Sequence, residues 1–452
     1  MRIIVAGAGA GKTTSMAKMV QERLGQITNG KIIYVITYTN AARDRIRELI
    51  IKLYGVIPKQ IHIETLHVFL LREIIFPYHH LLYGLRLNKI SLIKLSNNPR
   101  FKASKIKELR ENKMIHVEQV TEIARWIVFK KTGDDKTVQR NREKIKAIIT
   151  RCLDSVFIDE AQDMDEHLVK IIEVLNKIGV FITLIGDPKQ DLRGRNSFKG
   201  MIKTYKQDVQ YVTVNHRCPI SHVLLANKYI PEQEKQIAES NEVGELLFVY
   251  ESDIKCSSFY ESTSWDQLFI LKKTRRFITH EDDNRHIEHN LEYELKQLVK
   301  KVLLNSNEID RMVYKIKSKV LADLKSNNFV IFRTIEGILN IKLDSRDMGK
   351  LNEAINLLRK PPKQTDIFVS SIDRVKGLEG KKCLFFVTCD IAAYLVGEKK
   401  EDNKVKNYLY VGLTRSRHTL AFLITQEVEK KYGKNVIGEF FESLKINQGN
   451  VN

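Results

Sequence analysis

The chain opens with Met1-Arg2-Ile3-Ile4-Val5-Ala6-Gly7-Ala8-Gly9-Ala10-Gly11-Lys12-Thr13-Thr14, and this stretch decides the fold. Residues 2–5 form a short β-branched, mostly apolar run, which predicts a buried strand. A helical pattern follows the loop, with apolar residues at Met16, Met19, Val20 and Leu24. A strand, a loop of small residues and a helix, in that order, are the context that a phosphate-binding loop requires.

The small residues of this loop let backbone N–H groups curl around phosphate oxygens, and the helix N-terminus adds a partial positive charge. Lys12 is expected to reach the β- and γ-phosphates of a nucleoside triphosphate, and the Thr13 hydroxyl to hold Mg²⁺. The predicted nucleotide-binding residues are Ala6, Gly7, Ala8, Gly9, Ala10, Gly11, Lys12, Thr13 and Thr14. Kinases, GTPases, transport ATPases and helicases all carry such a loop, so it does not decide the activity.

Two acidic residues follow a second predicted buried strand. Asp159 and Glu160 come directly after Val156-Phe157-Ile158, at the strand end where a parallel sheet presents its ligands. Asp159 is expected to bind Mg²⁺, directly or through water, and Glu160 to act as general base on the attacking water. Together with the phosphate-binding loop, this pair favours hydrolysis of the triphosphate.

More polar motifs follow along the chain. Gly186-Asp187-Pro188-Lys189-Gln190 comes after a predicted strand, and its Gln190 is placed to sense a γ-phosphate. Asn215-His216-Arg217 follows another strand-like run, and Lys376-Gly377-Leu378-Glu379 and Tyr410-Val411-Gly412-Leu413-Thr414-Arg415 lie near the C-terminus. A single arginine is most often a surface residue, so the weight rests on the whole ordered set.

Taken in order, these motifs resemble those of the Rep/UvrD/PcrA group of superfamily-1 DNA helicases. Ala6–Thr13 match the group's A-G-A-G-x-G-K-T, Thr37–Asn40 its T-F-T-N and Thr65–Phe69 its T-x-H-x-F. The later matches are Asp159–Asp163 to D-E-x-Q-D, Gly186–Gln190 to G-D-x-x-Q, Asn215–Arg217 to N-Y-R, Lys376–Glu379 to K-G-L-E and Tyr410–Arg415 to Y-V-G-x-T-R. The resemblance covers essentially the whole chain.

The resemblance implies an α/β fold of two RecA-like P-loop NTPase domains with parallel sheets, each carrying a small, mainly helical insertion. It implies ATP between the domains, with Mg²⁺ held by Thr13 and Asp159. The implied catalytic residues are Glu160, Gln190, Arg217 and Arg415, whose two guanidinium groups would stabilise charge developing on the γ-phosphate. His216 and Glu379 are further implied nucleotide-binding residues.

The resemblance also implies a track for single-stranded DNA. The positions that match strand contacts are Thr37, Tyr38, Thr39, Asn40 and His67. Arg193 and Arg195 stand where the group has aromatic residues, so contact there is expected to depend on phosphate charge or guanidinium stacking.

Three other positions depart from the pattern of the group. His216 replaces the tyrosine that stacks on the base, and Asp373 replaces the histidine before K-G-L-E. The glutamine motif with which relatives recognise adenine does not precede Ala6 here, so the choice between ATP and other nucleotides stays open.

Residues 1–76 and 150–215 are predicted to form the first RecA-like domain, and residues 216–280 and 326–452 the second. Residues 77–149 are the predicted first insertion, with basic helical stretches at 102–113, 117–131 and 136–150. Residues 281–325 are the predicted second insertion, flanked by strand-like runs at 267–271 and 329–332. This insertion is much smaller than in the larger relatives, which leaves open whether the protein can split a duplex.

Lys and Arg number 75 against 55 Asp and Glu, a formal net charge of +20. Such an excess favours a polyanionic partner, and the motifs point to single-stranded or forked DNA. The basic stretches of the first insertion are either solvated helix faces or contacts to a nucleic-acid backbone. No stretch approaches the roughly 20 apolar residues of a membrane helix, and the cysteines lack C-x-x-C spacing, so we expect a cytoplasmic protein without a membrane or zinc site.

The predicted activity is therefore an Mg²⁺-dependent, DNA-stimulated ATPase, a UvrD-like helicase or translocase that moves 3′ to 5′ on single strands as its relatives do. The compact plan, with Gly-Asp-Pro-Lys-Gln at residues 186–190, is also similar to the helicase-like subunit of Gabija anti-phage systems, which works with a nuclease partner. The alternative is thus a nucleotide-sensing regulatory ATPase subunit of a nuclease-containing defence complex, without productive unwinding. An RNA helicase is a third, weaker possibility.

Overall fold

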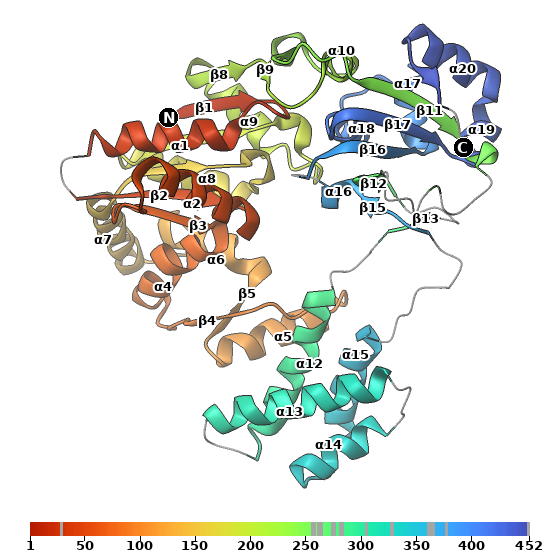
Figure 1. The fold of residues 1–452 in the computed structure, drawn as a ribbon. Helices are drawn as coiled ribbons and strands as arrows, with labels where there is room; N and C mark the ends of the chain where they lie inside the picture. Colours follow the sequence, from red (N-terminus) through yellow and green to blue (C-terminus); the bar gives the residue numbers. More distant parts are fainter. Residues whose placement is uncertain are drawn as a thin grey trace. The chain divides into compact units, whose positions relative to one another are not determined.

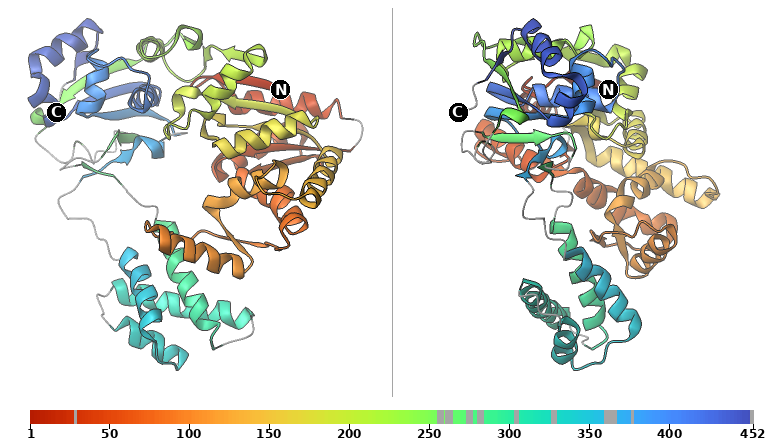
Figure 2. Two further views of the ribbon diagram at one scale, coloured as in Figure 1. Left: turned by 180° about the vertical axis from the view of Figure 1, so that it is seen from behind. Right: turned by 90° about the vertical axis from the view of Figure 1, so that its right-hand side faces the viewer.

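The computed structural model describes residues 1–27, 30–254, 259, 265–272, 277–279, 284–302, 306–325, 330–358, 367–375 and 378–449. The chain forms two compact units. The larger unit comprises Met1–Gly84, Val120–Thr279 and Ile367–Asn452, and the smaller unit comprises Leu85–Gln119 and His280–Asp366. Two large sheets, visible in Figure 1 and from two further sides in Figure 2, belong to the larger unit.

Six parallel strands form the first sheet, in the order β3-β2-β6-β7-β1-β8. They are β1 (Arg2–Ala6), β2 (Ile32–Thr37), β3 (Ile61–Thr65), β6 (Leu153–Ile158), β7 (Phe181–Gly186) and β8 (Val209–Val212). Val5 of β1 lies opposite Gly186 of β7, so the loops that follow these two strands leave the sheet at the same edge. The strands predicted at the start of the chain and before Asp159 are confirmed.

Helices connect these strands, as parallel pairing requires. They are α1 (Lys12–Leu24), α2 (Asn40–Tyr54), α8 (Glu166–Lys177) and α9 (Ser197–Thr204). Ile3, Val35 and Ile158, one from each of three strands, are completely buried. Near-continuous apolar strands of this kind are typical of a sheet covered on both faces.

The second sheet also has six parallel strands, in the order β15-β12-β16-β17-β11-β18. They are β11 (Glu245–Tyr250), β12 (Gln267–Ile270), β15 (Ser370–Ser371), β16 (Gly380–Val387), β17 (Ser416–Ile424) and β18 (Asn447–Gln448). Two parallel six-stranded sheets with connecting helices are what two RecA-like domains require, so the predicted fold class is confirmed.

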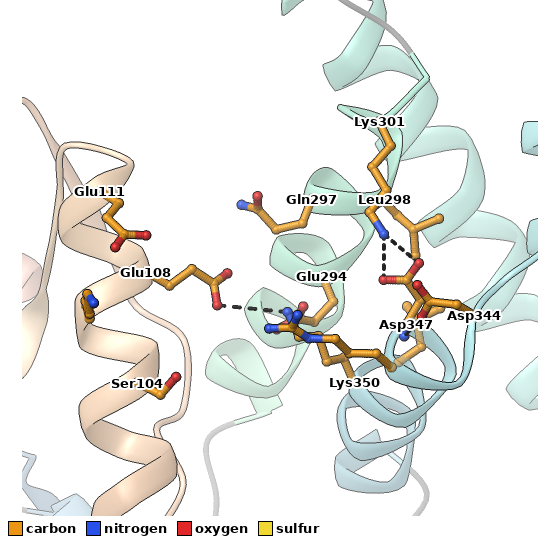
Figure 3. Close-up of a pocket in the computed structure, with 13 residues that line it drawn as sticks. Ser104, Glu108, Glu111, Glu294, Gln297, Leu298, Lys301, Asp344, Asp347 and Lys350 are labelled. Carbon is orange, nitrogen blue, oxygen red and sulfur yellow. Dashed lines mark hydrogen bonds and ion pairs between the residues drawn. The ribbon is translucent and has the colours of Figure 1, made fainter.

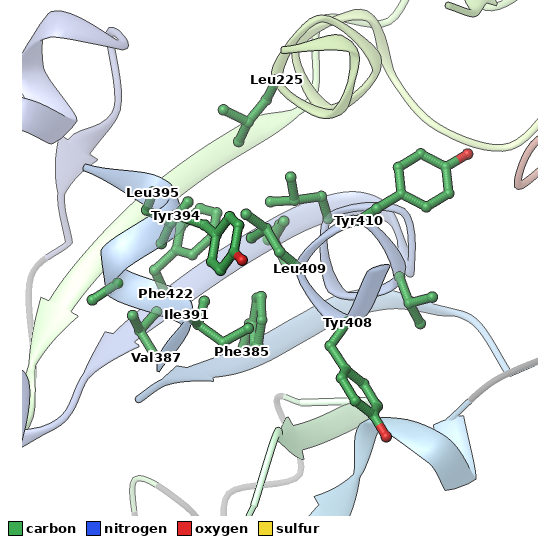
Figure 4. Packing of buried hydrophobic residues seen from close by; sticks show 14 of the residues in the cluster. Leu225, Phe385, Val387, Ile391, Tyr394, Leu395, Tyr408, Leu409, Tyr410 and Phe422 are labelled. Carbon is green, nitrogen blue, oxygen red and sulfur yellow. The ribbon is translucent and has the colours of Figure 1, made fainter. Parts of the chain in front are cut away.

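An aromatic core fixes helices on the second sheet (Figure 4). Phe385 of β16 and Phe422 of β17 are fully buried, with ring centroids 6.1 Å apart. Leu409 and Tyr410, on α18 (Lys404–Leu413), pack into the same cluster. Because α18 is buried along most of its length, the segment that follows it, Thr414 and Arg415, is held firmly beside the sheet.

A short connection joins the two sheets. It contains β9 (Val214–Asn215), α10 (Ile220–Asn227) and β10 (Ile237–Ala238), and β9 pairs in parallel with β10. Leu225 of α10 packs into the core of the second sheet (Figure 4).

The predicted basic helical stretches between residues 102 and 150 are helices. They are α5 (Pro99–Glu111), α6 (Val120–Val128) and α7 (Lys136–Cys152). α6 and α7 belong to the larger unit with α4 (Phe76–Tyr83), whereas α5 and the paired strands β4 (Lys89–Ser91) and β5 (Met114–His116) belong to the smaller one.

The smaller unit also contains the helices α12 (Asn284–Val299), α13 (Ser306–Lys325), α14 (Ile331–Leu339) and α15 (Ser345–Leu358). The strand predicted at residues 329–332 is wrong for Ile331 and Phe332, which begin α14, while Phe329 lies outside the described residues. Ile331, Ile335 and Leu339 are buried at helical spacing, and a run of four apolar residues was too short to show that period. The helical region therefore extends beyond residue 325, where the second insertion was predicted to end.

A pocket of about 540 Å³ in the smaller unit lies between α5 and the helices α12 and α15 (Figure 3). Lys301 pairs with Asp347 at 2.7 Å, and Lys350 approaches Glu108 at 3.9 Å. Because carboxylates line this pocket together with the cations, it lacks the positive character that a triphosphate needs.

No helix within the described ranges is both long and apolar enough to cross a bilayer.

His222 on α10 is completely buried in the connection between the sheets. Burial, and secondarily the charge of His418, lower the pKa of His222 to about 4. An imidazole in an unfolded chain has a pKa near 6.5. The unfolded chain therefore binds more protons than the folded protein between these two values, and stability must fall as the pH is lowered through this window.

We expect the free energy of unfolding to fall between pH 7 and pH 5, with about 2 kcal/mol of the loss due to His222. His222→Leu is expected to remove that part of the pH dependence, because leucine does not titrate. Urea unfolding of both proteins at the two pH values measures the difference. Equal pH dependence in the two proteins would show that His222 does not titrate in this way.

Candidate functional site

The predicted phosphate-binding loop runs from the end of β1 to the start of α1. Gly11 stands at the N-cap of α1 with φ of 67°, a left-handed conformation that glycine adopts without strain. The Lys12 ammonium lies 3.1 Å from the carbonyl oxygen of Gly7 and 3.4 Å from that of Ala6. The predicted order of strand, small-residue loop and helix is confirmed, with Lys12 folded over the loop.

Asp159 and Glu160 stand at the end of β6, beside this loop. Asp159 is buried, and burial first, then the neighbouring Glu160 carboxylate, raise the pKa of Asp159 to about 7. Lys12 and a hydrogen bond from Thr13 act in the opposite direction. A hydroxyl and a carboxylate side by side are the hard oxygen donors that Mg²⁺ prefers, so Thr13 and Asp159 fit the ion that the sequence predicts.

Gln162 fixes the direction of Glu160. Its side-chain amide donates a hydrogen bond to the Glu160 carboxylate, and its carbonyl oxygen accepts from the backbone N–H of Asp187 at 2.9 Å. Gln162 is completely buried. The amide therefore links the predicted general base to the loop that carries Gln190.

Gln190 lies on the loop after β7. Its side-chain amide donates to Asp187 at 2.9 Å. The opposite Asp187 oxygen pairs with the Lys189 ammonium at 3.0 Å, and Lys189 also pairs with Glu234 at 2.6 Å. These pairs hold Gln190, which is itself buried, in place.

A single cavity of about 410 Å³ brings the predicted catalytic groups together. The first sheet contributes Lys12, Asp159, Glu160 and Gln190 to its lining, the connection contributes Arg217, and the segment after α18 contributes Arg415. Ala8, Gly9, Ala10, Gly11, Thr13 and Thr14 of the loop also line it. The arrangement therefore joins a phosphate cradle, a carboxylate pair and two guanidinium groups.

Both arginines are held by other groups. Arg415 is 1% exposed and donates to the carbonyl oxygens of Val411 and Leu378, each at 3.1 Å. Burial, and then the nearby Arg217 charge, lower the pKa of Arg415 to about 10, so it remains charged at neutral pH. Arg217 pairs with Glu379 at 2.5 Å.

Four predicted nucleotide-binding residues do not line this cavity, namely Ala6, Gly7, His216 and Glu379. His216 donates its backbone N–H to the carbonyl oxygen of Gly9, while its side chain pairs with Glu239 at 2.5 Å. Glu379 bridges Arg217 and Arg417. The structure thus gives Glu379 the role of orienting Arg217. Lys376 and Gly377 of the same motif lie outside the described residues.

The residues predicted to contact single-stranded DNA form two groups. One is the consecutive residues Thr37–Asn40, and the other is His67 with Arg193 and Arg195. Tyr38 and Thr39 line the cavity, Thr37 is buried at the end of β2, and Asn40 begins α2 with its side chain exposed. Burial raises the pKa of Tyr38, and Asp163, Asp165 and the two arginines at 193 and 195 are close enough to influence it.

His67 lies in the same neighbourhood. Burial lowers its pKa, and Asp165 and Arg193 act on it as well. Arg193 and Arg195 are exposed, with the Arg195 guanidinium donating to the carbonyl oxygen of Asp163 at 2.6 Å. An aromatic ring, an imidazole and two cations therefore gather beside the cavity, and contact of these residues with single-stranded DNA stays a prediction.

Asp373, the departure from the group's histidine, accepts hydrogen bonds from the Tyr408 hydroxyl at 3.1 and 3.0 Å. The Tyr408 hydroxyl oxygen also lies 3.4 Å from the carbonyl oxygen of Leu192, and the Asn407 side-chain amide donates to the carbonyl oxygen of Asp191 at 3.1 Å. The loop that carries Arg193 and Arg195 is thus tied to the second sheet through α18.

Sequence reasoning missed several residues of the site. Gln162, Asn215 and Tyr410 lie inside the quoted motifs, which could have drawn attention to them. Gln236 also contacts the phosphate-binding loop but lies in no motif, so nothing in the sequence marks it.

Comparison with protein families matches residues 1–194 to a model described as an AAA domain. The matched stretch includes the predicted phosphate-binding loop, Asp159, Glu160 and Gln190, so this part of the chain is similar to an AAA domain. No curated protein matches the chain. Among solved structures, it is similar to an arterivirus nonstructural protein 10, a helicase in complex with DNA, at 10% identity and a TM-score of 0.35. That similarity covers 93% of this chain and 59% of the viral one.

Proposed function

We propose that the protein is a UvrD-like ATP-dependent helicase or translocase, which couples hydrolysis of Mg²⁺-ATP to movement on single-stranded DNA. The observation that carries the proposal is the cavity that unites Lys12, Asp159 and Glu160 from the first sheet with Arg217 and Arg415. Hydrolysis needs every one of these groups, and movement needs them on parts that can shift relative to one another.

In this proposal the loop N–H groups and Lys12 bind the β- and γ-phosphates. Thr13 and Asp159 would hold Mg²⁺, which supplies charge neutralisation on the phosphates. Glu160, directed by Gln162, accepts the proton of the attacking water, and Gln190 orients that water or senses the γ-phosphate. Arg217 and Arg415 stabilise the charge that develops on the γ-phosphoryl oxygens.

Loss of the γ-phosphate would weaken the attraction between the first sheet and the two arginines. In this proposal the resulting movement of α18 is passed to Arg193 and Arg195, which are expected to contact the DNA, because α18 contacts the loop that bears them. Alternate gripping of the strand by the two sheets would then move the protein, in the 3′ to 5′ direction on this proposal. The bound partner is single-stranded or forked DNA.

A fluorescent forked duplex tests the proposal. Strand separation in the presence of Mg²⁺ and ATP by the protein alone supports the helicase. Strong ATPase activity on single strands without separation supports a translocase, or the regulatory ATPase subunit of a nuclease-containing anti-phage complex. Addition of the protein encoded by the neighbouring gene distinguishes these two, because only for a regulatory subunit should a nuclease activity of that protein change with ATP.

The salt dependence of strand binding should depend on Arg193 and Arg195. Each phosphate contact on a single strand contributes about 0.7 to the slope of log affinity against log salt concentration. We expect the combined Arg193→Ala and Arg195→Ala substitutions to weaken binding and to reduce the slope by about 1.4. Fluorescence anisotropy with a labelled oligonucleotide between low and moderate salt measures it.

Lys399→Ala with Lys400→Ala removes the same charge from exposed positions after α17 (Cys389–Leu395), far along the chain from the track. This control should keep the wild-type slope. Equal slopes in both double variants and the wild type would place the phosphate contacts elsewhere.

A further inference from the structure

Ala8 of the phosphate-binding loop is held through both of its backbone groups. Its N–H donates to the hydroxyl of Tyr410 at 3.1 Å. Its carbonyl oxygen accepts from the side-chain amides of Asn215 at 2.9 Å and Gln236 at 3.1 Å. A loop that is expected to bind phosphate is therefore also anchored by side chains from the connection and from α18.

The anchoring side chains also bind one another. The side-chain oxygen of Gln236 accepts hydrogen bonds from the side-chain amide of Asn215 at 3.1 Å and from the Tyr410 hydroxyl at 3.4 Å. Asn215 and Tyr410 are 1% exposed and Gln236 is 5% exposed. We call Ala8 and these three side chains the Ala8 ring. None of these three side chains lines the cavity. They therefore hold the loop without occupying the space expected for the nucleotide.

The loop is shaped to admit this contact. A Cβ atom on Gly7 would lie 2.5 Å from Cδ of Gln236, closer than any real side chain allows. Gly7 therefore serves the approach of Gln236 as well as the wrapping of phosphate.

Two members of the Ala8 ring, Asn215 and Tyr410, lead to side chains that line the cavity. The side-chain oxygen of Asn215 accepts hydrogen bonds from the backbone N–H groups of Arg217 and Cys218 at 2.9 and 2.8 Å. Tyr410 lies on α18, and the Arg415 guanidinium donates to Val411 of that helix. The Lys189 ammonium lies 5.1 Å from the centre of the Tyr410 ring and pairs with Asp187, which in turn accepts from Gln190.

We propose that Tyr410 and Gln236 are positioning residues for hydrolysis, which set the place of α18, and with it Arg415, relative to the phosphate-binding loop. The inference rests on the proposed ATPase function. Stabilisation of a transition state depends on the placement of the stabilising charge to within fractions of an ångström, whereas ground-state phosphate binding is spread over many N–H groups. Removal of hydrogen bonds from the Ala8 ring should therefore slow hydrolysis and leave nucleotide affinity unchanged.

Tyr410→Phe removes the hydroxyl group and keeps the aromatic ring beside the Lys189 ammonium. One buried neutral hydrogen bond changes a rate by roughly three- to tenfold, so we expect kcat to fall by that factor with KM and the dissociation constant of a fluorescent ATP analogue unchanged. Gln236→Met, which removes the carbonyl oxygen and the NH2 of the side-chain amide at similar volume, is expected to give the same pattern. Tyr250→Phe is the matched control, because Tyr250 of β11 is also buried and donates to a single backbone carbonyl, that of Lys434.

A double-mutant cycle with Arg415→Lys tests whether the ring acts through Arg415. We expect Tyr410→Phe to change the single-turnover rate by less than about twofold once Arg415 has been replaced. Full additivity, a rise in KM alone, or effects equal to those of Tyr250→Phe would overturn the inference. Failure of the wild-type protein to hydrolyse any nucleotide would instead refute the proposed function, so the two failures are distinguishable.

Discussion

Glu160→Gln is expected to lower the rate of ATP hydrolysis by about a thousandfold, the contribution typical of a well-placed general base. The glutamine amide keeps the shape of the side chain but cannot take a proton from water. Nucleotide binding should be retained or tightened, because Glu160 is one of the causes that raise the pKa of Asp159. Phosphate release and binding of a fluorescent ATP analogue measure the two effects separately.

Glu166→Gln is the matched control for this prediction. Glu166 lies six residues later in the first turn of α8, where its side chain is exposed. This variant should hydrolyse ATP at the wild-type rate, whereas Lys12→Ala should lose hydrolysis together with much of its nucleotide affinity. Undiminished hydrolysis in Glu160→Gln would exclude Glu160 as the base.

Arg415→Lys is expected to lower kcat by about a hundredfold or more, with little change in nucleotide affinity. Lysine keeps the positive charge but cannot donate to the carbonyl oxygens of Val411 and Leu378 while presenting a planar fork to the γ-phosphate. Steady-state hydrolysis and single-turnover rates measure the loss.

Arg23→Lys makes the same change at the far end of α1, where Arg23 pairs with Asp154 at 2.7 Å. It should leave kcat near the wild-type value. If Arg415→Lys behaved like this control, the reaction would not depend on a planar guanidinium at position 415.

Much of the fold was predictable because its strands are apolar runs that end in polar motifs. The run before Lys12 and the run before Asp159 both form strands of one parallel sheet, as expected. The segment around Ile331 was not predictable in this way, since four apolar residues fit a strand and a buried helix equally well. Only the longer spacing to Leu339, together with its packing, shows the helix.

The candidate site was predictable where its chemistry needs particular residue types in a fixed order. Lys12, Glu160, Gln190 and Arg415 were predicted from motifs, and all of them line one cavity. Gln236 was not predictable, because a glutamine that bonds a backbone carbonyl has no characteristic neighbours in sequence. Its role depends on the pairing of β9 with β10, which brings it to Ala8.

The structure also separates residues that the resemblance had grouped. Glu379 was predicted beside the nucleotide, yet its carboxylate is shared by Arg217 and Arg417. A motif shows that a residue type is present at a position. It does not show which partner takes the charge, because that depends on side chains from another element.

The ATPase rate with and without single-stranded DNA tests the central claim most directly. With Mg²⁺ present, saturating single strands should raise the rate by about tenfold or more, about 1.4 kcal/mol of transition-state free energy, while Glu160→Gln shows no measurable stimulation. Parallel reactions with duplex DNA, forked DNA and RNA show which nucleic acid the track prefers. A rate that is identical with and without every nucleic acid would contradict a nucleic-acid-coupled ATPase.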